Sequence, residues 1–370
     1  MPRRAVFLTS NGLWAHEHGG DHVLRAERLR RTVELLQAYG AFAAPNVQVV
    51  EPRPAREAEL ALFHTPEYVE VVRHLSDGDL SLPYWDYGFG PGDNPVFSGM
   101  YESEGLKVGS ALVGARMLID GDCDVAFSFG GGLHHAGPAE ASGFCVFNDA
   151  VVVLRWLQAR GLRVAYVDID VHHGDGVQWA FFDSDRVLAI SLHQDGRTLF
   201  PGTGSVGEIG RETGVGYNVN VPLPRLTDDQ AYLYAFDALV PPLLDRFRPD
   251  LVVTQLGVDT HFLDPLADLM LTTAGHAALF ERLGQLAPRW LALGGGGYNI
   301  DVVPRSWTLA FGVMSGQRFA DAIPASFRTR YGSEWLHDRI GPDLGEEERR
   351  AVRKRVDAVV ASVRERHGLA

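Results

Sequence analysis

Short runs of consecutive apolar residues, each ending in polar or glycine-rich sequence, recur along the chain. The five clearest runs span residues 125–129, 164–167, 187–190, 251–256 and 291–293. Their apolar residues are consecutive rather than alternating, which is typical of strands that are buried on both faces of a parallel sheet. The pattern therefore predicts a central, mostly parallel β-sheet.

Amphipathic stretches with helical spacing lie between these runs, at residues 100–119, 149–158, 228–247 and 273–286. Strand and helix alternate, which predicts an α/β fold: a three-layer α/β/α sandwich around the sheet. The sequence has no internal repeat and no linker-like tract, so we expect one domain over residues 1–370. The charged stretch 345–367 has the spacing of a solvated C-terminal surface helix.

The polar residues that follow the predicted strands should emerge on one rim of the molecule. In parallel sheets with helices on both faces, ligands bind beyond the carboxyl ends of the strands. The residues in question are His134, His135, Asp168 to Asp175, Ser191 to His193, Asp259 and Tyr298. The alternation of elements thus gathers distant segments into one candidate site.

The chain has 370 residues and a formal net charge of −13. This composition supplies no excess of Lys and Arg for phosphate contacts and argues against a nucleic-acid partner. No apolar run reaches the roughly 18 residues of a membrane-spanning helix, and the apolar part of the N-terminus is too short for a signal peptide. The two cysteines, Cys123 and Cys145, do not suggest a disulfide framework. We expect a cytoplasmic protein with no membrane partner.

Asp170 and His172 follow a predicted strand two residues apart, where an extended backbone points both side chains to the same side. Asp259 follows another predicted strand and can supply a third ligand. One His and two carboxylates leave room for water and substrate, as in a catalytic zinc site. Each residue alone could be a loop cap or a hydrogen-bonded turn residue, but the density of Asp and His at 168–176 favours the metal.

Two aspartate ligands neutralise a zinc ion, so its water should be less acidic than at a site of three neutral histidines. A protein base is then expected, and His134 and His135 in the glycine-rich loop 130–137 offer two imidazoles. Asp168 and Asp175 are available to orient the two rings, which predicts two His–Asp dyads. The alternative is that the two histidines are satisfied polar residues of a buried loop.

Tyr298 follows four glycines at 294–297, which allow close backbone approach. Its phenol could reach a substrate carbonyl oxygen and stabilise the developing oxyanion. A phosphate cradle is the competing interpretation, but the Lys-Ser/Thr pair of a P-loop is missing. A further group, His16, His18 and His22, is flanked by glycines and is interpreted as an exposed loop rather than a second metal site.

Several motifs together resemble those of the histone deacetylase and acetoin-utilisation deacetylase superfamily, over roughly residues 20–315. They are LHHA at 133–136, GFCVFN at 143–148, VDIDVHHGDG at 167–176, SLH at 191–193, FPGTG at 200–204, NVNVPL at 218–223 and GGGGY at 294–298. The resemblance implies an arginase-like α/β fold. It also implies Asp170, His172 and Asp259 as zinc ligands, and His134 and His135 as the catalytic pair with His135 as general base.

The same resemblance implies a narrow apolar tunnel for the acyl-amine stem. Its positions in this sequence are Gly143, Phe144 and Phe200 in the wall, Leu266 near the mouth, and Asp93 as a rim carboxylate that grips the substrate backbone. An aromatic residue or Leu at such positions is otherwise more often ordinary core.

Members of the family also bind monovalent cations, and the resemblance implies potassium. The matching positions for a first ion are Asp168, Asp170, His172, Ser191 and Leu192. Those for a second ion are Phe181, Ser184, Val187 and Tyr217.

These features predict metal-assisted hydrolysis of an acyl amide to amine and acetate, with zinc as the default metal and Fe²⁺ or Co²⁺ as alternatives. The resemblance implies acetyl-lysine in a protein such as an acyl-CoA synthetase as substrate, or else an acetylated polyamine. Two other classes stay open. A binuclear ureohydrolase of the arginase type would need further metal-binding carboxylates, and a binding module that has lost catalysis would lack Tyr298, His135 or a ligand.

Overall fold

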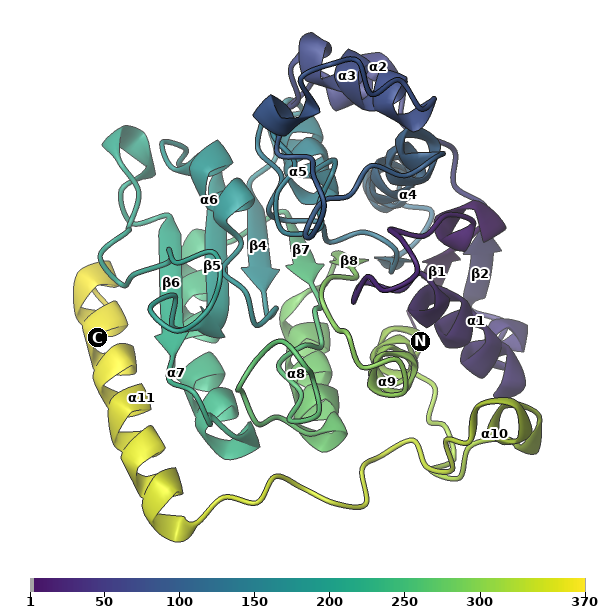
Figure 1. The fold of residues 1–370 in the computed structure, drawn as a ribbon. Coiled ribbons are helices and arrows are strands. Elements are labelled where there is room, and N and C mark those ends of the chain that lie inside the picture. The colour runs from purple at the N-terminus through teal and green to yellow at the C-terminus, as the bar shows by residue number, and fades with distance from the viewer. Residues whose placement is uncertain (1–2, 370) are drawn as a thin grey trace.

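In the computed structural model, residues 3–369 are described, and this part of the chain contains a single eight-stranded sheet (Figure 1). The strands are β1 Ala5–Leu8, β2 Val47–Val50, β3 Val125–Ser128, β4 Val164–Asp168, β5 Val187–Gln194, β6 Asn218–Leu223, β7 Leu251–Gln255 and β8 Trp290–Leu293. Their order is β2-β1-β3-β8-β7-β4-β5-β6, and every pairing is parallel. The predicted α/β/α fold with a parallel sheet is confirmed.

Helices cover both faces of this sheet (Figure 1). Their bounds are α1 Glu27–Ala38, α2 Glu57–Leu60, α3 Pro66–Ser76, α4 Met100–Asp120, α5 Asp149–Gln158, α6 Asp175–Phe181, α7 Asp229–Phe247, α8 Thr273–Leu286, α9 Val302–Ser315, α10 Ala325–Tyr331 and α11 Glu346–His367. One hydrophobic core lies between the sheet and helices α1, α7, α8, α9 and α11. A second core lies between the sheet and helices α3 to α6.

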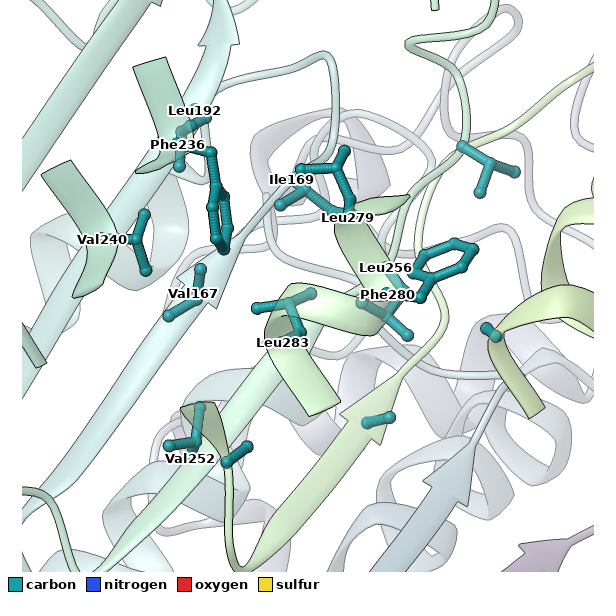
Figure 2. Packing of buried hydrophobic residues seen from close by; sticks show 14 of the residues in the cluster. Val167, Ile169, Leu192, Phe236, Val240, Val252, Leu256, Leu279, Phe280 and Leu283 are labelled. Atoms are coloured by element: carbon teal, nitrogen blue, oxygen red, sulfur yellow. The ribbon is translucent and has the colours of Figure 1, made fainter. Parts of the chain in front are cut away.

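Successive residues of the central strands enter opposite cores. In β4, Val167 belongs to the first core, whereas its neighbour Tyr166 belongs to the second. Figure 2 shows the first core, where Phe236 and Val240 of α7 lie close to Val167. Burial on both sides is why these strands are read as continuous apolar runs in the sequence.

Three strands, β1, β2 and β6, escaped the sequence analysis. β1 is fully buried, and its length of four residues does not distinguish it from β3 and β8, which were predicted; β2 is a partly exposed edge strand. In β6 the polar side chains of Asn218 and Asn220 interrupt the apolar run. They can be buried because both donate to the side-chain oxygen of Gln178, at 2.8 and 2.7 Å. A buried strand with internal polar partners therefore does not have the consecutive pattern that identified the others.

The helix predicted at 345–367 is α11, but it is not solvated all round. One face of it is buried in the first core through Val352, Val356, Val360 and Val363. Figure 1 shows it running beside β6 and α7. Within residues 3–369, no helix is both long enough and apolar enough to cross a bilayer.

Candidate active site

The candidate residues gather where three neighbouring strands end. In the sheet, Asp168 of β4 lies opposite Gln255 of β7, which in turn lies opposite Leu293 of β8. The loops that follow these three strands carry the predicted metal ligands and Tyr298. Because parallel strands end at the same edge, the sheet brings together segments that are more than a hundred residues apart.

Asp170, His172 and Asp259 form a buried group whose ligand atoms all lie within 4.8 Å of one another. Nδ1 of His172 lies 3.1 Å from Oδ1 of Asp170 and 3.2 Å from Oδ2 of Asp259. Among residues 3–369 this is the one group of three such side chains close enough to share an ion. One imidazole nitrogen and two carboxylates fit zinc in an open catalytic site.

Hydrogen bonds from the backbone and from Gln255 hold the two carboxylates in place. Oδ2 of Asp170 accepts from Nε2 of Gln255 at 2.6 Å and from the N–H of Gly296 at 2.7 Å. Oδ1 of Asp259 accepts from the N–H of Val171 at 2.8 Å. A Cβ at Gly296 would lie only 1.9 Å from Oδ2 of Asp259, so glycine is required there. Partners of this kind fix the orientation of metal ligands.

His134 and His135 lie beside this group, and each is paired with an aspartate. Nδ1 of His134 lies 2.7 Å from Oδ2 of Asp168, and Nδ1 of His135 lies 2.7 Å from Oδ1 of Asp175. The two Nε2 atoms face each other at 3.0 Å. The structure thus places the four residues in the two dyads that the sequence suggested.

The imidazoles of His134 and His135 differ in pKa. Burial lowers the pKa of His134, but the negative charges of Asp168 and Asp170 outweigh this effect and raise that pKa to about 9. Burial, together with the neighbouring charge of His134, lowers the pKa of His135 to about 4. The pair therefore combines a cationic imidazole with a neutral one.

Aromatic rings flank the histidines and Tyr298. The ring of Phe200 lies 5.0 Å from that of His135, and the ring of Phe144 lies 5.6 Å from that of Tyr298. Gly143 fits between two of these rings, because a Cβ there would lie 2.5 Å from His135 Cδ2 and 2.9 Å from Phe200. These contacts place the three predicted tunnel residues around the candidate metal group.

The predicted rim residues lie farther out. Asp93 is exposed, and its carbonyl oxygen accepts a hydrogen bond from Nε2 of His22 at 3.3 Å. The His22 ring also packs edge-on against Phe144, at 4.8 Å. Leu266 is half-buried in the loop that follows Asp259. His22 is thus a rim residue that the sequence analysis did not identify.

The sequence analysis predicted an exposed loop around His16, His18 and His22, and this prediction is wrong for His18. Its side chain is buried, with 7% of the residue exposed, and its ring packs on those of His22 at 5.0 Å and Phe97 at 4.7 Å. Burial lowers the pKa of His18 to about 3. Glycine flanks do not imply exposure when a neighbouring loop covers the segment.

Tyr298 is positioned by its own backbone. Its N–H donates to Oδ2 of Asp264 at 2.8 Å, and the carbonyl of the preceding Gly297 accepts from Nη1 of Arg28 at 2.9 Å. Burial raises the pKa of Tyr298 well above its usual value, so the phenol keeps its proton and can donate it in a hydrogen bond.

Three residues that shape the site were not found from the sequence: Asp264, Gln255 and Asp149. Asp149 accepts from the N–H groups of Gly132 and Leu133, at 2.9 and 2.8 Å, and so forms the loop that carries the two histidines. A signal for Gln255 was available, since it is a polar residue inside the predicted apolar run 251–256. Asp264 lies in the same strand-end loop as Asp259.

The predicted potassium positions fall into two regions, and both sites stay predictions. The first set, Asp168, Asp170, His172, Ser191 and Leu192, lies at the carboxyl ends of β4 and β5. The second set, Phe181, Ser184, Val187 and Tyr217, lies near the start of β5 and before β6.

A metal ion held by N and O ligands can polarise an amide, and paired imidazoles beside it can move protons. This is the chemistry of metal-dependent amidohydrolases. The fold and the site place the chain in this class. The sequence profile of the histone deacetylase domain matches residues 22–314, and the chain belongs to this family. It is therefore a metal-dependent deacetylase.

Individual relatives agree with this assignment. The chain is 37% identical to the acetoin utilization protein AcuC of Bacillus subtilis over 341 residues, which cover 89% of this chain and 87% of the relative. It is 39% identical to histone deacetylase 19 of Arabidopsis thaliana over 329 residues, covering 88% and 64%. The crystal structure of a histone deacetylase homologue from Aquifex aeolicus superposes with a TM-score of 0.88 at 27% identity, covering 97% of this chain and 99% of that one.

Proposed function

We propose that the chain hydrolyses the acetyl amide of a lysine side chain in a protein or peptide, releasing the free amine and acetate. The observation that carries this proposal is the buried Asp170–His172–Asp259 group beside two His–Asp dyads. The Phe144 and Phe200 rings that flank it suit an unbranched alkyl stem such as that of lysine.

Zinc held by Asp170, His172 and Asp259 would polarise the acyl carbonyl and make water a better nucleophile. His135, oriented by Asp175, takes the proton that the attacking water loses. The hydroxyl of Tyr298 donates a hydrogen bond to the developing oxyanion. His134, held by Asp168, balances the charge and assists protonation of the leaving amine. Fe²⁺ or Co²⁺ would fit the same donors.

An acetylated polyamine is the alternative substrate, and hydrolysis of its acetyl amide would follow the same chemistry. The test is acetate release from an acetyl-lysine peptide and from N-acetylputrescine, at equal concentrations of the metal-loaded enzyme. We expect the larger kcat/KM on the peptide. A larger value on N-acetylputrescine would make the polyamine the substrate, and no acetate from either compound would contradict the proposed reaction.

The other two classes are less well supported. A binuclear ureohydrolase needs ligands for two ions, whereas one ligand group occurs within residues 3–369. An inactive binding module would not need Tyr298, His135 and all three ligands, which are present. Urea release from arginine, assayed alongside acetate release, distinguishes the first of these classes.

Three further features belong to this proposal. An acetylated acyl-CoA synthetase is a suitable protein substrate for a second assay. The cytoplasm is the proposed location, supported by Cys123 and Cys145 being buried free thiols. Potassium is proposed at the two predicted sites, and replacing K⁺ in the buffer by N-methylglucamine should lower the melting temperature.

A further inference from the structure

A pocket lies at the opposite end of the strands from the active site. It has a volume of about 340 Å³ and lies between the ends of α7 and α11 and the start of β5. Arg163, which lines it, directly precedes β4, and Leu188 is the second residue of β5. Because the active-site loops follow the carboxyl ends of the same parallel strands, this pocket is separate from the active site.

Positive charge concentrates at this pocket. Three guanidiniums, those of Arg163, Arg246 and Arg366, line it together with His367, and no Asp or Glu does. Among residues 3–369, none of the three arginines forms an ion pair with a carboxylate. In a chain with a formal net charge of −13, three cations that line one pocket and form no ion pair give it local positive charge.

A role at helix ends accounts for only part of this arrangement. Arg246 and Arg366 lie in the last turns of α7 and α11, where cations stabilise the helix dipole, and Arg246 donates to the carbonyl of His367. Arg163 precedes a strand and has no such role. Its guanidinium lies over the ring of Phe247, 4.4 Å from the centroid.

The positive charges of the pocket act on His367, which lies in its wall. Burial lowers the pKa of this imidazole, and the charges of Arg246 and Arg366 lower it further, against a hydrogen bond to the carbonyl of Gly216. His367 and Arg366 also lie outside residues 22–314, which match the family profile. The pocket therefore depends on the C-terminal helix of this chain.

We propose that this pocket binds a small organic anion, with a phosphate or carboxylate group on an apolar or aromatic body. Guanidiniums bind both oxyanions through paired hydrogen bonds. The remaining walls are apolar or aromatic, formed by Leu188, Val215, Tyr217, Leu243 and Phe247. The volume of about 340 Å³ suits a ligand of one ring rather than a dinucleotide.

Calorimetric titration of the metal-loaded protein at low ionic strength tests the proposal. The probes are phenyl phosphate and benzoate, with inorganic phosphate and phenol as controls for the anion and the ring alone. We expect phenyl phosphate or benzoate to bind more tightly than either control, and the tighter of the two identifies the anion. Binding should weaken as salt is added, because guanidinium–oxyanion attraction is screened.

The variants Arg163→Gln and Arg366→Gln should each weaken this binding by about tenfold or more, because each removes one charged partner. Neither guanidinium forms a hydrogen bond with residues 3–369, so both variants should fold, as melting curves without ligand will show. The matched control is Arg350→Gln, an exposed arginine on α11 outside the pocket. The proposal is overturned if neither organic anion binds at millimolar concentration, or if Arg350→Gln weakens binding as much as Arg366→Gln.

Discussion

The carboxylate of Asp264 connects Tyr298 to the loop that carries the ligand Asp259. One of its oxygens accepts from the N–H of Tyr298 at 2.8 Å, and the other accepts from the N–H of Leu266 at 3.0 Å. Only 7% of Asp264 is exposed, so water does not readily replace these bonds. Asp264 is a positioning residue in our interpretation, since it acts through the backbone of Tyr298.

Replacing Asp264 by Ala should lower kcat about tenfold or more with a smaller effect on KM, because a displaced phenol affects the transition state more than substrate binding. Asp264→Asn keeps one side-chain acceptor oxygen and should retain more activity. Steady-state kinetics on an acetyl-lysine peptide would measure both. Equal, unchanged kcat values in the two variants would contradict the positioning role.

Tyr298→Phe removes the hydroxyl that donates to the oxyanion and leaves the ring. We expect kcat to fall by roughly 10²- to 10³-fold, the usual effect of losing one oxyanion donor. The bound metal, measured by atomic emission, should stay at the wild-type level, because Tyr298 is not among the ligands. An enzyme that keeps half its turnover would rule out this role of the phenol.

Replacing His172 by Ala should reduce bound zinc well below one ion per chain. The remaining donors, Asp170 and Asp259, would form an incomplete site. Asp120→Asn, at an exposed carboxylate at the end of α4, serves as the control and should bind as much zinc as the wild type. Metal content after dialysis against a chelator and reloading with zinc measures the difference. Full occupancy in His172→Ala would place the ion elsewhere.

Stability should fall in mild acid partly because of His64, which is 1% exposed and whose Nε2 accepts from the N–H of Asn148 at 3.0 Å. Burial lowers the pKa of this imidazole to about 4, against roughly 6.5 in an unfolded chain. As pH falls below 6.5 the unfolded chain takes up the proton first, so the free energy of unfolding decreases until about pH 4. Above pH 6.5 the group has no such effect.

The variant His64→Gln cannot take up this proton. Between pH 7 and pH 5 it should lose roughly 2 kcal/mol less unfolding free energy than the wild type. Urea unfolding at the two pH values measures the difference. If both proteins lose the same amount, His64 does not contribute to the acid sensitivity.

The fold was predictable where burial alone determines the sequence pattern. Val164 to Val167 identified β4 because both of its faces are buried, whereas β6 was missed because Asn218 and Asn220 have buried polar partners. Consecutive apolar residues report burial, and they do not report strands stabilised by internal hydrogen bonds.

The same limit applies to the site. Asp170 and His172 directly follow a predicted strand, and their place at the carboxyl edge of the sheet follows from topology alone. His22 reaches the rim only because a loop near the N-terminus folds over Phe144. Asp264 meets Tyr298 through the path of two loops. No periodicity encodes such loop contacts, so these residues required the three-dimensional structure.

β4 and β7 are neighbours in the sheet, although α6, β5, β6 and α7 lie between them in sequence. The donors that follow these two strands meet only when β4 and β7 are paired in the register that sets Asp168 opposite Gln255. An ion that needs all three donors binds the native chain in preference to unfolded or half-assembled chains, so its affinity adds to the free energy of folding. The metal thus binds preferentially to molecules whose strands have the native order in the sheet.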